Sequence, residues 1–200
     1  MRKVLEFGGY AAAVILVGFG IASLVVSIVG RNEVHDNLAR EQIEGTPDMT
    51  PEGIQEGAEA AGIEVSDLPT CSVAGELVDT GEEAKCFADY MRVHALEATG
   101  GRVYAEMGRY LTEGGEETND PAEAAQQDGQ PVSNQARDIW VTETALATAL
   151  YMGFFGEAVS MFGILVAIAL IIAGLGFAIL SFAALRWLPA REAKRPAAAT

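Results

Sequence analysis

Residues 158–185 read AVSMFGILVAIALIIAGLGFAILSFAAL and contain no charged side chain across 28 positions. As an α-helix this stretch would measure about 42 Å, more than the roughly 30 Å hydrocarbon core of a bilayer. An apolar run of this length predicts a transmembrane helix. Neither this run nor any other motif in the chain identifies a substrate or a reaction, so the sequence predicts architecture better than chemistry.

A second charge-free run covers residues 7–29, directly after the basic pair Arg2 and Lys3. Its 23 residues would measure about 35 Å as a helix, which is also enough to cross a bilayer. A cleaved signal peptide has a shorter apolar region, and no A-x-A-like cleavage site precedes Arg31. We therefore predict an uncleaved signal anchor and, in total, two membrane-spanning helices.

Charge divides the chain into parts of opposite sign. Residues 31–157 contain 26 Asp and Glu against seven Lys and Arg, a net charge of −19, whereas the two terminal flanks together carry +4. Basic flanks of membrane helices stay in the cytoplasm. The sequence thus predicts a multi-pass protein of the cell membrane with five parts: a cytoplasmic N-terminus (1–6), a first transmembrane helix (7–30), an acidic extracytoplasmic domain (31–157), a second transmembrane helix (158–185) and a basic cytoplasmic tail (186–200).

The chain has two cysteines, Cys71 and Cys86, and both fall in the acidic domain. An extracytoplasmic compartment lets disulfides persist. A bridge that closes a loop of about fifteen residues contributes roughly 3 kcal/mol in the chain-entropy model. Two free buried thiols are the alternative. We predict the disulfide because the pair is the whole cysteine complement and the topology argument does not depend on it.

Helix-start signals recur in the acidic domain. Thr50-Pro51-Glu52 combines an N-cap hydroxyl with a first-turn proline and predicts a short helix that ends near Gly62. Residues 80–83, Thr-Gly-Glu-Glu, match the capping box and predict a second helix. Apolar spacing predicts a third helix over 103–111, and the polar residues 116–131 predict a mobile loop. The domain is therefore expected to be mainly α-helical.

The second membrane helix is predicted to begin well before the apolar run. Ser133 or Asn134 can cap it, and no proline follows until Pro189, so one helix of about 80 Å would project far beyond the bilayer. The half outside the bilayer carries many large apolar side chains, more than an isolated helix in water would expose. Two sources of cover stay open: the rest of the acidic domain and a neighbouring copy of the chain.

Small residues spaced four apart let helices approach closely in a membrane. Three such pairs are packing candidates: Gly18 with Ala22, Gly163 with Ala167, and Ala169 with Ala173; Gly174 and Ala178 have the same spacing. The first helix could pack against the second through these pairs and form a hairpin, which is the favoured interpretation. Alternatively, the second helix could pack against the same helix of another subunit.

Catalytic and metal-binding patterns are missing from the sequence. His35 and His94 lack metal-ligand spacing, and no nucleophile elbow or phosphate-binding glycine motif is present. We expect a protein that is not an enzyme and needs no cofactor or metal. An acidic surface also disfavours nucleic acid as a partner. Glu157, directly before the second apolar run, either lies solvated at the headgroup level or marks an ion path.

Two segments, EGTPDMTP (44–51) and ARDIWVTETAL (136–146), are similar to stretches of small uncharacterised two-span membrane proteins from actinobacteria. The resemblance covers most of the chain and implies the same two-span architecture. That family offers no established site, so no functional residue carries over.

The function predicted from the sequence is interaction. We expect a self-assembling or accessory membrane subunit whose partners are the lipid bilayer and either further copies of itself or another membrane protein. An oligomeric channel or transporter component is the alternative.

Overall fold

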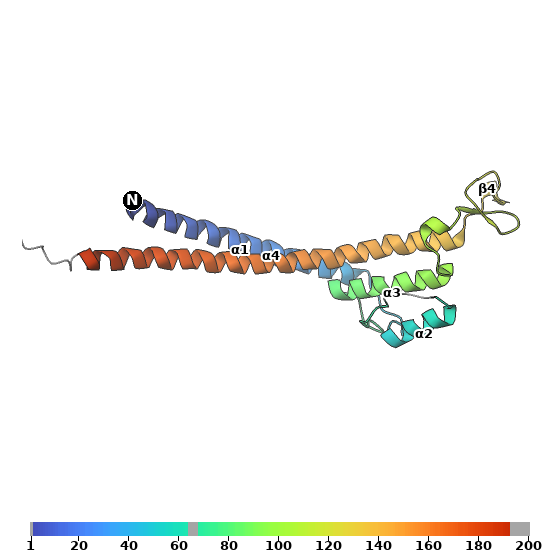
Figure 1. The fold of residues 1–200 in the computed structure, drawn as a ribbon, viewed down its shortest axis with the longest axis horizontal. Coiled ribbons are helices and arrows are strands. Elements are labelled where there is room, and N and C mark those ends of the chain that lie inside the picture. Colours follow the sequence, from blue (N-terminus) through green and yellow to red (C-terminus); the bar gives the residue numbers. More distant parts are fainter. Residues whose placement is uncertain (1, 64–67, 193–200) are drawn as a thin grey trace, which may run out of the picture. The chain divides into compact units, whose positions relative to one another are not determined.

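The structure is a computed structural model that describes residues 2–63 and 68–192, with side-chain surroundings for residues 7–63 and 68–183. It is mainly helical (Figure 1). Its elements are, in order, α1 (Arg2–Arg40), α2 (Pro51–Ala61), α3 (Gly81–Thr99), the 3-10 turn η1 (Tyr104–Glu106), β1 (Tyr110–Leu111), β2 (Glu117–Thr118), β3 (Gln126–Gln127), β4 (Gln130–Pro131) and α4 (Gln135–Glu192). Most of the predicted basic tail, from residue 193 onwards, lies outside the described residues.

The chain divides into two compact units. Met1–Asn32 and Ala158–Thr200 form one unit, called here the helix pair, and Glu33–Glu157 form the other, called the acidic domain. Within the described residues, α1 and α4 are the two helices long and apolar enough to cross a membrane.

In the helix pair, α1 and α4 approach closely where one of them has a small residue. A Cβ atom on Gly20 would lie 2.7 Å from Ile171 Cγ1 and 3.0 Å from the Ala167 carbonyl oxygen. A Cβ atom on Gly174 would lie 3.0 Å from the Ala13 carbonyl oxygen. Because backbone atoms stand so near these two glycines, glycine is what permits this approach.

The helices of the acidic domain begin and end where the local sequence signals place them. The Thr50 hydroxyl accepts a hydrogen bond from the Gly53 N–H at 3.0 Å, and α2 ends at Gly62, whose φ of +69° suits glycine. Thr80 and Glu83 form the complete capping box at the start of α3. Both predicted helices are therefore confirmed.

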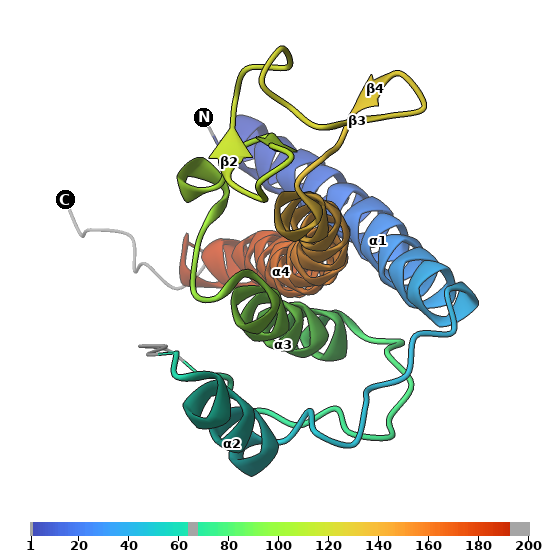
Figure 2. The same ribbon diagram turned by 90° about the vertical axis from the view of Figure 1, so that its right-hand side faces the viewer.

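Packing in the acidic domain centres on α3, which lies between α2 and the first part of α4 (Figures 1 and 2). Toward α2 the core contains Met49, Ile54, Ala58, Val73, Cys86, Tyr90 and Val93. Toward α4 it contains Leu38, Val78, Ala84, Ala88, Ala147 and Leu150. The Cys71–Cys86 disulfide is formed, and the buried Tyr90 hydroxyl donates to the Cys71 carbonyl oxygen at 2.5 Å.

One local prediction is wrong: residues 103–111 do not form an α-helix but the turn η1 and the strand β1. Residues 116–131, predicted to be a mobile loop, contribute strands to two short hairpins, β1–β2 and β3–β4. Polar bonds centred on Glu117 connect the β1–β2 hairpin to its surroundings. Its carboxylate accepts hydrogen bonds from the Gly108 N–H, from Arg102 and from the Asn134 amide. Apolar periodicity carries no information about such bonds.

Candidate functional site

Glu157, the last residue of the acidic domain, bridges distant parts of that domain. One carboxylate oxygen accepts a hydrogen bond from the Gly81 N–H at 2.6 Å, and the other lies 2.9 Å from His35 Nε2. Gly81 is the first residue of α3, where backbone N–H groups lack partners within the helix and negative charge is favoured. A Cβ atom on Gly81 would lie 2.9 Å from Phe154 Cα, so only glycine allows this approach.

This arrangement gives Glu157 a structural role in the folded domain. It joins the end of α1, through His35, to the start of α3 and to α4. The sequence indicated Glu157 because of its position before the apolar run, but its partners are 76 and 122 residues away in the chain. No local pattern could have identified them.

A second buried carboxylate, Glu143, lies between α4 and α3. Its side chain is 4% exposed, and it pairs with Arg92 Nη1 at 3.0 Å. The Arg92 guanidinium also lies over the Trp140 ring, 4.6 Å from its centroid. Burial raises the pKa of Glu143, although the charge of Arg92 and a hydrogen bond from the Thr144 hydroxyl oppose this. Within the described part of the chain, Glu143 Oε1 has no hydrogen-bond partner.

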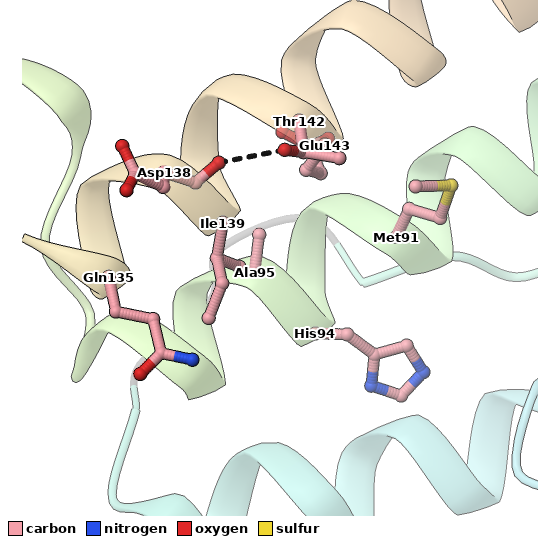
Figure 3. Close-up of a pocket in the computed structure, with 8 residues that line it drawn as sticks. All are labelled: Met91, His94, Ala95, Gln135, Asp138, Ile139, Thr142 and Glu143. Atoms are coloured by element: carbon pink, nitrogen blue, oxygen red, sulfur yellow. Dashed lines mark hydrogen bonds between the residues drawn. The ribbon is translucent and has the colours of Figure 1, made fainter. Parts of the chain in front are cut away.

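Glu143 borders a pocket of about 500 Å³ between α3 and α4 (Figure 3). The lining residues are Met91, His94 and Ala95 from α3, and Gln135, Asp138, Ile139, Thr142 and Glu143 from α4. Figure 3 shows that the His94 ring points toward α2. There it lies 3.3 Å from Asp48 and 3.0 Å from Glu97, between two carboxylates.

The chemistry available in this pocket is limited. Met91, Ala95 and Ile139 supply its apolar wall, and the other five lining residues are polar or charged. Over residues 2–63 and 68–192, no group of three or more His, Cys, Asp and Glu side chains is arranged to hold a metal ion. The sequence did not single out Glu143, because burial of its side chain against Arg92 depends on packing between two helices.

A further pocket, of about 520 Å³, lies on the disulfide side of α3 and includes Asp89 and Tyr151. The Tyr151 hydroxyl donates to Asp89 Oδ1 at 2.6 Å. Burial and the adjacent Asp89 raise the pKa of Tyr151 to about 12. Tyr151 is therefore protonated at neutral pH and holds α4 to α3.

The predicted packing residues fall into two groups in the helix pair. Gly163 faces the Ser27 side chain, and Ala167 is fully buried at the contact with α1. The other four candidates, Gly18, Ala22, Ala169 and Ala173, are exposed. A Cβ atom on Gly18 would meet nothing within 4 Å. Close approaches also occur at Gly174, which has the same spacing to Ala178, and at Gly20, which the spacing did not single out.

One face of α4 within the acidic domain is both uncovered and uncharged. Met152 and Phe155 are 59% and 58% exposed, and Val141 is also exposed. Between positions 139 and 155 the single charged residue is Glu143, whose side chain is buried. An exposed apolar surface of this kind on a folded domain typically marks an interaction site.

Comparison with known proteins adds no relative to this picture, since no protein-family model, curated protein or solved structure matches the chain.

Proposed function

We propose that this chain is a non-enzymatic integral membrane protein that acts as an interaction subunit. In this account α1 and the apolar part of α4 cross the cell membrane, both termini are cytoplasmic, and the acidic domain faces the outside. The domain then binds partners, either further copies of the chain or another membrane protein.

The membrane assignment is supported by the surface of the helix pair. Large side chains such as Phe19, Phe162 and Leu180 are each at least two-thirds exposed. In water this surface would carry a large hydrophobic penalty, whereas lipid would cover it without cost. The disulfide in the acidic domain agrees with an extracytoplasmic location.

The observation that carries the interaction role is the uncovered, uncharged face of α4. The acidic domain repels anionic surfaces generally, because residues 31–157 carry a net charge of −19. A partner can still approach over residues 139–155, where exposed side chains are apolar or are threonine and alanine. Binding of a partner would remove this apolar surface from water, and that burial would stabilise the complex.

The alternative, a channel or transporter component, is less well supported. Glu157 would be the acidic group of an ion path in that account. Its carboxylate instead bonds to the Gly81 N–H and to His35 inside the acidic domain. We therefore propose interaction rather than conduction as the main function.

Native mass spectrometry on protein extracted gently in detergent tests this proposal. We expect the chain in a defined complex, either with itself or in fixed stoichiometry with another membrane protein. A lone chain under conditions that preserve known membrane complexes would contradict the proposed function.

A further inference from the structure

We infer that the partner of the uncharged α4 face is a second copy of this chain, bound through a parallel helix seam. The seam consists of Val141, Ala145, Thr148, Met152 and Phe155. This inference rests on the proposed function and specifies the partner that the function leaves open.

The spacing of the seam residues is that of a coiled coil. They follow one another at intervals of four, three, four and three, the heptad pattern that brings two helices together in a left-handed supercoil. All five side chains are exposed within the acidic domain. The Thr148 hydroxyl donates to the Thr144 carbonyl oxygen at 2.7 Å, so its polar group is satisfied within its own helix. Each seam position can therefore enter an apolar contact.

Charge favours a second copy at this seam. Two copies of an acidic domain repel each other wherever their carboxylates meet, and the cost of like charges grows as water is removed. None of the five seam residues is charged, and the one charged residue of α4 between Val141 and Phe155, Glu143, is buried against Arg92. Two identical α4 helices can therefore touch along the seam without bringing their own exposed carboxylates into contact.

The same spacing continues in the sequence of α4 beyond the acidic domain. Its next members are Val159, Phe162, Val166, Ala169, Ala173, Gly176 and Leu180. In the helix pair, considered by itself, all of these except the half-buried Gly176 are exposed. Two heptads alone are shorter than the three to four that a coiled coil usually needs, and this continuation supplies the missing length. It also gives Ala169 and Ala173, which do not face α1, a packing role.

Membrane anchoring determines the orientation of the two copies. Chains inserted with the same topology present α4 in the same direction, so the pairing is parallel. In a parallel dimer each core residue meets its own counterpart in the other helix. A single seam position should therefore cross-link to itself.

Cysteine cross-linking in native membranes tests this geometry. Cys71 and Cys86 are bonded to each other, so in a variant with one introduced cysteine the cross-link forms through that cysteine. We expect Met152→Cys to form a covalent dimer on mild oxidation. The control is Leu146→Cys, which lies on the same helix and is 39% exposed, but off the seam; it should remain a monomer. Equal cross-linking of both variants, or of neither, would overturn the seam.

A charge substitution provides a second readout that does not depend on thiol chemistry. Phe155→Glu should abolish the dimer seen by native mass spectrometry, whereas Leu146→Glu should leave it intact. An unchanged circular dichroism spectrum and an intact Cys71–Cys86 bond would show that both variants are folded. A dimer that persists in folded Phe155→Glu would refute the seam.

The outcomes for the wild-type chain separate the two proposals. A complex with a different membrane protein, together with no cross-linking of Met152→Cys, would refute the second copy and leave the interaction function standing. A wild-type chain that is monomeric in native mass spectrometry, together with no cross-linking of Met152→Cys, would refute both.

Discussion

The acidic domain and the helix pair are stabilised by different kinds of contact. In the acidic domain, bonds between residues far apart in the sequence fix the elements: the Cys71–Cys86 disulfide, the Arg92–Glu143 ion pair and the Glu157 bond to the start of α3. In the helix pair, closeness comes from residues with little or no side chain, such as Gly20 and Gly174.

This difference agrees with the proposed membrane topology. Polar bonds specify a unique arrangement in a small domain whose surface is wet and highly charged. In lipid there is little hydrophobic drive for helices to associate, so close packing takes its place. Four substitutions test this comparison, ordered here from the largest expected effect to the smallest.

Removal of the disulfide should have the largest effect. We expect the double substitution Cys71→Ser and Cys86→Ser to lower the stability of the acidic domain by about 3 kcal/mol and its Tm by roughly 10 °C. Thermal unfolding followed by circular dichroism measures this. A reducing agent should lower the Tm of the wild type and not that of the variant. An unchanged Tm would show that the α2–α3 core does not need the bridge.

Gly174→Leu should separate the helices of the pair. The new side chain would collide with the Ala13 carbonyl oxygen and with Val17, and overpacking of this kind costs about 2 kcal/mol. Gly18→Leu is the matched control, because a Cβ atom there meets open space. Thermal unfolding in detergent should show a loss of stability for the first variant alone. Equal losses in both would mean that close approach at Gly174 is not what joins the helices.

Arg92→Met should destabilise the acidic domain by leaving the Glu143 carboxylate buried without its countercharge. Because Arg92 itself is 36% exposed, we expect about 1.5 kcal/mol, less than for a fully buried pair. Arg102→Met is the control, since it breaks the more exposed pair with Glu117 and should cost less than about 1 kcal/mol. Adding Glu143→Met to Arg92→Met should restore much of the loss in chemical denaturation. A double variant no more stable than Arg92→Met would contradict this explanation.

Glu143→Gln should produce the smallest effect, a change in pH dependence. Burial raises the pKa of Glu143 in the folded state, so the folded chain holds this proton more tightly than the unfolded chain does. The contribution to stability is therefore complete below the unfolded pKa, about 4.3, and is lost as pH rises through the folded pKa. Unfolding free energies should fall more steeply with pH, upward from about pH 4, in the wild type than in the variant. Parallel curves would show that this carboxylate does not titrate differently on folding.

Much of the fold follows from local sequence signals. The capping box at Thr80, the end of α2 at Gly62, and two long apolar helices are properties of short segments, and each appears where the sequence indicates it. The Cys71–Cys86 disulfide was predictable because the chain offers no other pairing.

The rest depends on contacts that no short segment records. Glu117 connects the β1–β2 hairpin to Gly108, Arg102 and Asn134, and the polar composition that predicted a mobile loop contains no sign of these bonds. The sequence around Glu143 does not indicate burial, because its side chain is covered only by packing against α3. Small-residue spacing marks Gly163 and Ala167, which lie at the contact with α1, and equally Gly18 and Ala22, which are exposed.

The central claim is the proposed topology, with the N-terminus in the cytoplasm and the acidic domain outside, and thiol labelling in intact cells tests it most directly. Glu113→Cys places a thiol at an exposed position in the acidic domain, and Lys3→Cys places one at the N-terminus. A membrane-impermeant maleimide should label Glu113→Cys in intact cells and Lys3→Cys only after the membrane is permeabilised. Labelling of Lys3→Cys in intact cells, with Glu113→Cys protected until permeabilisation, would contradict the account.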